Sequence, residues 1–89
     1  MITITDDGAR TLVKIAGTAD YLAALASDME DRASDEHVYG VPAPWIGDVA
    51  AGLRDAVERG PYVHVQCDVL GRSARPLYAV IKRVGKRRA

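Results

Sequence analysis

The sequence predicts a single α+β domain with the element order ββααββ. We expect a four-stranded, mostly antiparallel sheet with two helices packed on one face. Three observations support this fold class. Period-two runs of β-branched residues lie near both ends of the chain, and two stretches with 3.6-residue apolar spacing lie between them. At 89 residues the chain has room for one hydrophobic core, and its 48% apolar and 27% charged residues are typical of a globular protein.

The N-terminal part of the chain predicts a β-hairpin followed by a helix. Ile2–Thr5 alternates with period two, Asp6–Gly8 supplies a turn, and Arg10–Ile15 resumes a β-prone run. Thr18 is a suitable N-cap for the helix, and Asp20 then lies in its first turn. We expect this helix over residues 19–33, with an apolar stripe of Leu22, Leu25, Ala26, Met29 and Ala33.

The second half predicts another helix and then a second hairpin. Pro44 suits the start of this helix, because its missing N–H costs no hydrogen bond in the first turn, and Gly60-Pro61 ends it. Its apolar stripe is Ile46, Val49, Ala50, Leu53 and Val57. In the strand that follows, Val63, Val65, Cys67 and Val69 share one face, and Tyr62, His64, Gln66 and Asp68 share the other. A loop over Leu70–Pro76 leads to the partner strand, Leu77–Val84.

The assembly of these elements has two alternatives. We expect one domain over residues 1–84 and a flexible basic tail over residues 85–89. Alternatively, the two hairpins stay separate and are completed by a second chain, since an isolated hairpin is marginal in water. The strands Arg10–Ile15 and Leu77–Val84 carry enough Val, Ile and Leu to pair edge to edge if they are uncovered. We therefore expect a homodimer.

The composition of the chain predicts where the protein is located in the cell and what kind of genome encodes it. The single Cys excludes an internal disulfide, and the N-terminal residues lack the basic and apolar segments of a signal peptide. No apolar run approaches the ~20 residues of a membrane helix, so a cytoplasmic protein is expected. The absence of Phe and Asn, with nine Arg to three Lys, is typical of GC-rich coding, as in an actinobacterium or one of its phages or plasmids.

No sequence motif predicts an enzyme, a cofactor or a metal. Phosphate-binding glycine loops and the zinc and nucleophile motifs HExxH, CxxC and GxSxG are all missing. His64 and Cys67 are three residues apart on a strand, so they face opposite sides and cannot bind one ion without a bulge. The acidic residues Asp28, Glu30, Asp31, Asp35 and Glu36 lack the ligand spacing of a calcium loop. We expect a non-enzymatic protein.

Aromatic residues supply the candidate partner-binding residues. The stretch HVYGVPAPW, residues 37–45, contains the only Trp, and packing of Trp45 against the core is the favoured interpretation. The alternative is that Tyr39 and Trp45 are exposed anchors for a protein partner. The other candidates are on the predicted outer face of the sheet, and the full set is Tyr39, Trp45, Tyr62, His64 and Tyr78.

Charge is unevenly distributed along the chain. The last eighteen residues contain no acid and hold the candidate nucleic-acid-binding residues Arg72, Arg75, Lys82, Arg83, Lys86, Arg87 and Arg88. Tyr62, His64 and Tyr78 would then offer a stacking surface. However, the pI of about 6.7 is below the basic range of dedicated nucleic-acid domains. The leading expectation is a small interaction module that binds a protein partner or itself, and nucleic-acid binding through the basic hairpin and tail is the alternative.

Overall fold

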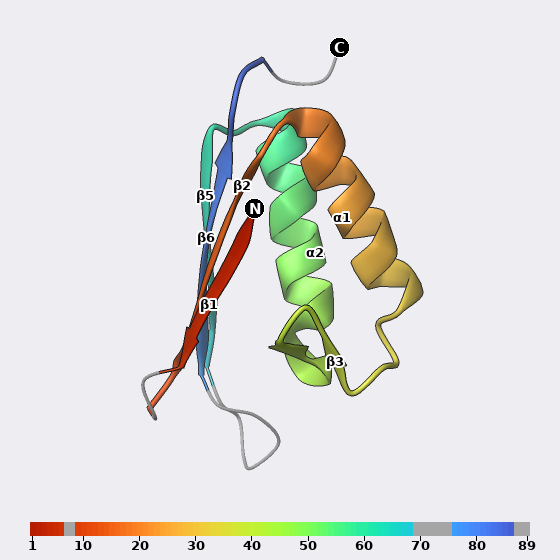
Figure 1. Cartoon of the computed structure of the whole chain (residues 1–89), viewed down its shortest axis with the longest axis vertical. Helices are drawn as coiled ribbons and strands as arrows, with labels where there is room; N and C mark the ends of the chain where they lie inside the picture. The colour runs from red at the N-terminus through yellow and green to blue at the C-terminus, as the bar shows by residue number, and fades with distance from the viewer. Residues whose placement is uncertain (7–8, 69–75, 87–89) are drawn as a thin grey trace.

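The computed structural model, which describes residues 1–6, 9–68 and 76–86, has two layers (Figure 1). The elements in chain order are β1 (Ile2–Asp6), β2 (Thr11–Gly17), α1 (Ala19–Asp31), β3 (His37–Val38), β4 (Val41–Pro42), α2 (Ala43–Glu58), β5 (Tyr62–Cys67) and β6 (Leu77–Arg83). Both helices cover one face of a four-stranded sheet, so the predicted α+β fold is confirmed. The alternative of two separate hairpins is wrong, because both hairpins belong to the same sheet.

The sheet has the strand order β1-β2-β6-β5, and its central pair is parallel. The pairs β1–β2 and β5–β6 are antiparallel hairpins. From β2 to β6 the chain reverses direction four times, through α1, α2, β5 and β6, so β6 runs the same way as β2 (Figure 1). The expectation that Arg10–Ile15 and Leu77–Val84 are available for edge pairing is therefore wrong. Each of these strands already has a neighbour on both sides, and the edges are β1 and β5.

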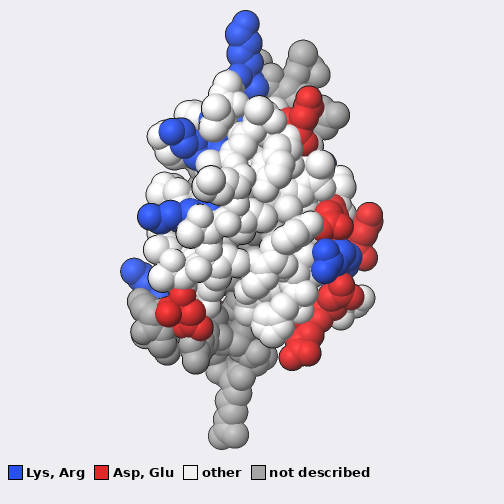
Figure 2. Space-filling model, in the orientation of Figure 1, with Lys and Arg blue, Asp and Glu red and all other residues white. Residues whose placement is uncertain are grey.

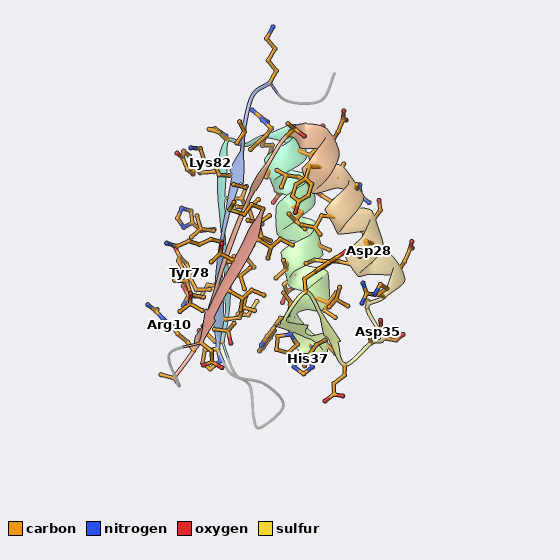
Figure 3. All side chains as sticks on the ribbon, viewed as in Figure 1. Arg10, Asp28, Asp35, His37, Tyr78 and Lys82 are labelled. Carbon is orange, nitrogen blue, oxygen red and sulfur yellow. The ribbon has the colours of Figure 1, made fainter. Side chains whose placement is uncertain are left out.

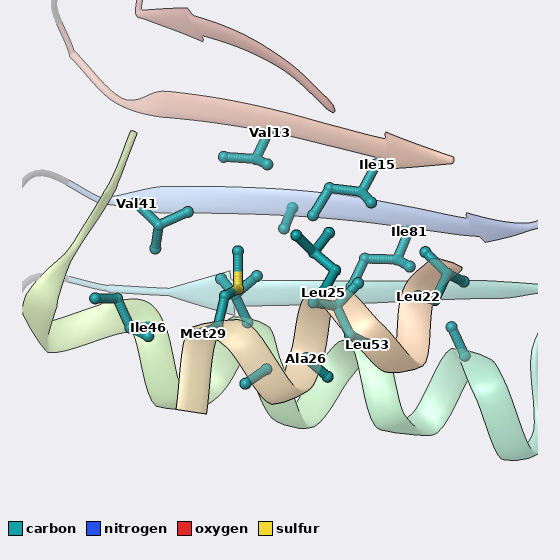
Figure 4. Close-up of a cluster of buried hydrophobic side chains, with 14 of the residues drawn as sticks. Val13, Ile15, Leu22, Leu25, Ala26, Met29, Val41, Ile46, Leu53 and Ile81 are labelled. Carbon is teal, nitrogen blue, oxygen red and sulfur yellow. The ribbon is translucent and has the colours of Figure 1, made fainter. Parts of the chain in front are cut away.

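The core lies between the sheet and the two helices (Figure 4). The sheet contributes alternate residues of its central strands, which are the buried Val13, Ile15, Leu77, Ala79 and Ile81. Both predicted helical stripes are buried, with one exception. Ala33 is exposed because α1 ends at Asp31, two residues earlier than predicted, and Arg32 is its C-cap.

The helix starts follow the local sequence. At α1 the Thr18 hydroxyl accepts a hydrogen bond from the Tyr21 N–H at 3.2 Å, as its N-cap position predicts. At α2 the N-cap is Pro42, which offers no side-chain hydrogen bond. Instead, the fully buried Val41 and Ile46 occupy the positions of a hydrophobic staple, one before the cap and one at the fourth helical residue (Figure 4). Apolar packing therefore fixes the entry of the chain into α2.

The connection between the helices contains a hairpin that was not predicted, formed by β3 and β4. Its two central residues, Tyr39 and Gly40, have φ angles of 51° and 78°. Two positive φ angles are characteristic of a type I′ turn, which suits a two-residue hairpin loop. The φ angle of 78° favours glycine at position 40, and a Cβ atom there would also lie 2.4 Å from Cδ1 of Ile4. The turn thereby packs against the edge strand β1.

Helix α2 packs closely on the sheet at Gly52. A Cβ atom there would lie 2.4 Å from Cγ2 of Val65 and 3.1 Å from Cδ1 of Ile81. Both atoms belong to short, branched, packed side chains that have little freedom to move. Gly47, on the same helix, would place its Cβ atom in open space.

These two glycines predict opposite effects of the same substitution. Gly47→Ala should raise the free energy of unfolding by about 0.5–1 kcal/mol, because alanine is the better helix former. Gly52→Ala should lower it by about 1–3 kcal/mol, because the added methyl group forces α2 away from the sheet. Urea denaturation of the two variants and the wild type measures both effects. Stabilisation by both substitutions would contradict the close packing of α2 on β5 and β6.

Candidate functional site

The sheet face opposite the helices carries the candidate functional residues. Cross-strand pairing arranges its side chains in three rows of neighbours that cross β1, β2, β6 and β5 in that order. We call this surface the open sheet face. Its rows are Met1, Ala16, Lys82 and Tyr62; Thr3, Lys14, Val80 and His64; and Thr5, Leu12, Tyr78 and Gln66. None of these residues is acidic.

The two sides of the molecule differ in charge. Lys and Arg gather on the sheet side, whereas most of the visible Asp and Glu gather on the helix side (Figure 2). Figure 3 places Arg10, Tyr78 and Lys82 on the outer side of the sheet, away from Asp28 and Asp35. A formal net charge of zero is therefore divided between two surfaces of opposite sign. Such a separation orients an approaching charged partner.

The structure brings together three of the predicted aromatic residues, Tyr62, His64 and Tyr78. His64 Nδ1 and the Tyr78 hydroxyl form a short hydrogen bond, and the two ring centroids lie 5.7 Å apart. Tyr62 is 58% exposed, and the Lys82 ammonium group lies 5.8 Å from its ring centroid. These residues form one aromatic patch beside a cation.

A shallow hollow of about 310 Å³ lies on the open sheet face beside this patch. Ala16 and Val80 give it apolar lining, and the stems of Lys14 and Lys82 border it together with Tyr62. The hollow therefore combines apolar surface and an exposed ring with the stems of two lysines.

Tyr39 and Trp45 lie away from the open sheet face. Tyr39, at the tip of the β3–β4 turn, donates a hydrogen bond from its hydroxyl to Asp28 Oδ2 at 2.6 Å, and the Arg32 guanidinium lies 5.6 Å from its ring. The hydrogen bond to the Asp28 carboxylate favours the neutral phenol and raises the pKa of Tyr39. Trp45 is partly buried and packs against the core. The geometry gives Trp45 a packing role, whereas Tyr39 is 44% exposed and its ring is held in place by Asp28 and Arg32.

The predicted basic residues do not share one surface. Lys82 is on the open sheet face and Lys86 is exposed beyond β6. Arg83 points to the helix side, where its Nη1 donates to the carbonyl oxygens of Ala56 at 3.1 Å and Val57 at 3.3 Å. It thus satisfies carbonyl groups at the C-terminal end of α2. The remaining candidates lie outside the described residues; they are Arg72, Arg75, Arg87 and Arg88.

Sequence reasoning missed Lys14, which lies at the centre of the open sheet face. Its neighbours there are Thr3 on β1 and Val80 on β6. The alternation in Thr11–Gly17, with Val13 and Ile15 facing the helices, was the signal that could have identified Lys14. This alternation shows that Lys14 points away from the helices. It does not show which residues surround Lys14, because that depends on which strand pairs with the other side of β2.

Cys67 and His64 point to opposite sides of β5, as their spacing predicted. Cys67 is 3% exposed, and its thiol lies 3.7 Å from Asp48 Oδ2. Burial, followed by the nearby Asp48 carboxylate, raises the pKa of the Cys67 thiol to about 11. Within residues 1–6, 9–68 and 76–86, no three His, Cys, Asp or Glu side chains lie close enough together to bind a metal ion.

We expect Cys67 to be unreactive in the folded protein. Ellman's reagent at pH 8 should leave the native thiol unmodified and should modify it fully in urea, because only the exposed thiolate is nucleophilic. The folded pKa of about 11 lies above the ordinary value of 9.0, so the contribution of the neutral thiol to stability is present below pH 9. It is lost as the pH rises through about 11. Rapid modification of the native protein would contradict this burial.

Comparison of the chain with protein-family models, with curated proteins and with solved structures gave no match. In the part of the chain that the structure describes, neither helix has the length and apolar character needed to cross a membrane. Function is therefore inferred from the surfaces of the molecule.

Proposed function

We propose that this protein is a small, non-enzymatic interaction module of the cytoplasm, of phage or mobile-element origin. It binds another polypeptide, a second copy of itself included, by adding a strand to the sheet at β5. One observation carries the proposal. β5 is a regular six-residue strand that pairs with β6 along its whole length and is an edge of the sheet.

The backbone of β5 offers a regular row of hydrogen-bonding groups at its outer side. The Arg83 N–H donates to the Pro61 carbonyl at 2.7 Å, which fixes the alternation of the antiparallel ladder. Val63 and Val65 therefore turn their N–H and C=O groups toward β6. The backbone groups of the alternate residues, Tyr62, His64 and Gln66, point outward, where a further strand can pair with them.

Edge strands of stable monomers usually carry a lysine, a proline or a bulge that prevents further pairing. Strand β5 contains no lysine or proline, and its register with β6 is uninterrupted from Tyr62 to Cys67. The other edge, β1, is shorter, and the Ile4 side chain packs against the turn at Gly40. These differences favour β5 as the interacting edge.

Pairing between two copies has a simple geometry. Two β5 strands running antiparallel about a two-fold axis would join the two four-stranded sheets into one continuous sheet. The same surface is used by both copies, as closed dimers require. The hydrogen bonds formed would replace those that the outer backbone groups of β5 make with water.

We expect the wild type to be a dimer at tens of micromolar, as measured by light scattering after gel filtration. His64→Pro should raise the dimer dissociation constant about tenfold or more, because it removes an outward N–H from the centre of the edge. The ladder to β6 is unaffected, since this N–H does not contribute to it. His64→Ala removes the same side chain, retains the N–H and should remain dimeric.

Two results would contradict this proposal in different ways. A monomeric wild type at tens of micromolar would exclude self-association. Equal association of the His64→Pro and His64→Ala variants would show that β5 is not the edge that pairs. Circular dichroism of both variants establishes that the sheet itself is retained.

A further inference from the structure

We propose that the open sheet face is a binding site for single-stranded nucleic acid. This inference uses a different surface from the β5 edge and does not require self-association. It also differs from binding by the basic hairpin and tail, because it is built from described residues of β2, β5 and β6. Three properties of the face carry it: its charge, its exposed rings and the hollow between them.

The open sheet face is positively charged, although the whole chain has a formal net charge of zero. The whole chain has 12 basic and 12 acidic residues, yet the three rows of this face contain Lys14 and Lys82 and no acidic residue. The exposed Asp68, just after β5, accepts a hydrogen bond from Gln66 at the rim of the face. Both lysines are exposed, and Arg10 lies at the lower rim on the same side (Figure 3). Their attraction for phosphate groups is independent of base sequence.

The rings of Tyr62, His64 and Tyr78 favour a partner that has flat rings of its own. Bases stack on aromatic side chains whatever their sequence, and they can do so only where they are not already stacked and paired within a duplex. Tyr62 is 58% exposed, His64 is exposed as well, and Tyr78 is half-buried. Single strands therefore fit this surface better than double-stranded DNA or RNA does.

The hollow lies between a residue that can stack with a base, Tyr62 on β5, and a residue that can attract a phosphate group, Lys82 on the neighbouring strand β6. It has Ala16 and Val80 as apolar lining, with Tyr62 at one side. The Lys82 ammonium group lies over the Tyr62 ring, 5.8 Å from its centroid, so a base that stacks on the other face of the ring has a cation close by for its phosphate. An acidic peptide would use the two lysines but leave the rings and the apolar lining without a matching group.

Fluorescence anisotropy with fluorescein-labelled oligo-dT and oligo-U of about 16 nucleotides tests the inference directly. We expect the wild-type full-length protein to bind at low salt. Tyr62→Ala should weaken binding about 5- to 150-fold, the effect of losing one stacked base. The double variant Lys14→Gln and Lys82→Gln should reduce the slope of log affinity against log salt by about 1.4, which corresponds to two lost phosphate contacts.

Two matched variants make the same chemical changes elsewhere. Tyr21→Ala removes a tyrosine that is 39% exposed on α1, and Arg59→Gln removes a cation whose side chain is 83% exposed after α2. Neither should change the affinity by more than about twofold, since both lie away from the open sheet face. Because the two lysines are exposed, their variant stays folded and tests the proposal even where Tyr62→Ala destabilises the sheet.

Four outcomes overturn the proposal. The first is no anisotropy change with either wild-type oligonucleotide at low salt. The second is wild-type affinity in both the Tyr62→Ala and the lysine variants. The third is a loss of binding only in a variant with Arg72, Arg75, Arg87 and Arg88 changed to Ala, which assigns the contact to the basic hairpin and tail. The fourth is binding of labelled poly-glutamate but of neither oligonucleotide, which assigns the face to an acidic protein partner.

Discussion

The parallel pairing of β2 with β6 is the constraint on which the rest of the structure depends. Each of these strands belongs to a different antiparallel hairpin, so their contact joins the two ends of the chain into one sheet. The register from Thr11–Leu77 to Gly17–Arg83 brings Val13 and Ile15 beside Ala79 and Ile81 under the helices. Without this pairing, each hairpin would be an isolated two-stranded unit, which is marginal in water.

The two faces of this sheet have different chemistry because only one is covered. On the helix side, apolar side chains fill the core, and even Arg83 bonds to the carbonyl groups that end α2. On the other side, the same strands present Lys14, Tyr78 and Lys82 to solvent. Asp28 and Glu30 of α1 form ion pairs with Arg32 and Arg54, away from the sheet. Charge separation between the two surfaces follows from this layering.

Much of the candidate surface could be predicted from alternation within single strands. Their positions in the strand predicted that Tyr62 and His64 face one side and Cys67 the other, and the structure confirms that Tyr62 and His64 are exposed while Cys67 is buried. The same rule, applied to Leu77–Arg83, would have placed Arg83 with the core and separated it from Lys82. Charge along the sequence does not reveal that separation, because it carries no information on the face of the strand to which each side chain points. The sharp turn at Tyr39 was missed for a different reason, since tyrosine is rare at positive φ.

The residue pattern alone determined the two helices and the four strands of the main sheet, and the side to which most of their residues point, but it did not reveal the β3–β4 hairpin. Helical and strand periodicities are properties of a short stretch of chain, so neighbours in space are not needed to recognise them. The tertiary structure alone decided that β2 and β6 are central, that β1 and β5 are edges, and that Lys14 stands beside Val80. A strand with one buried face has the same alternation beside any neighbour. Its partner is therefore chosen by the path of the whole chain around the core.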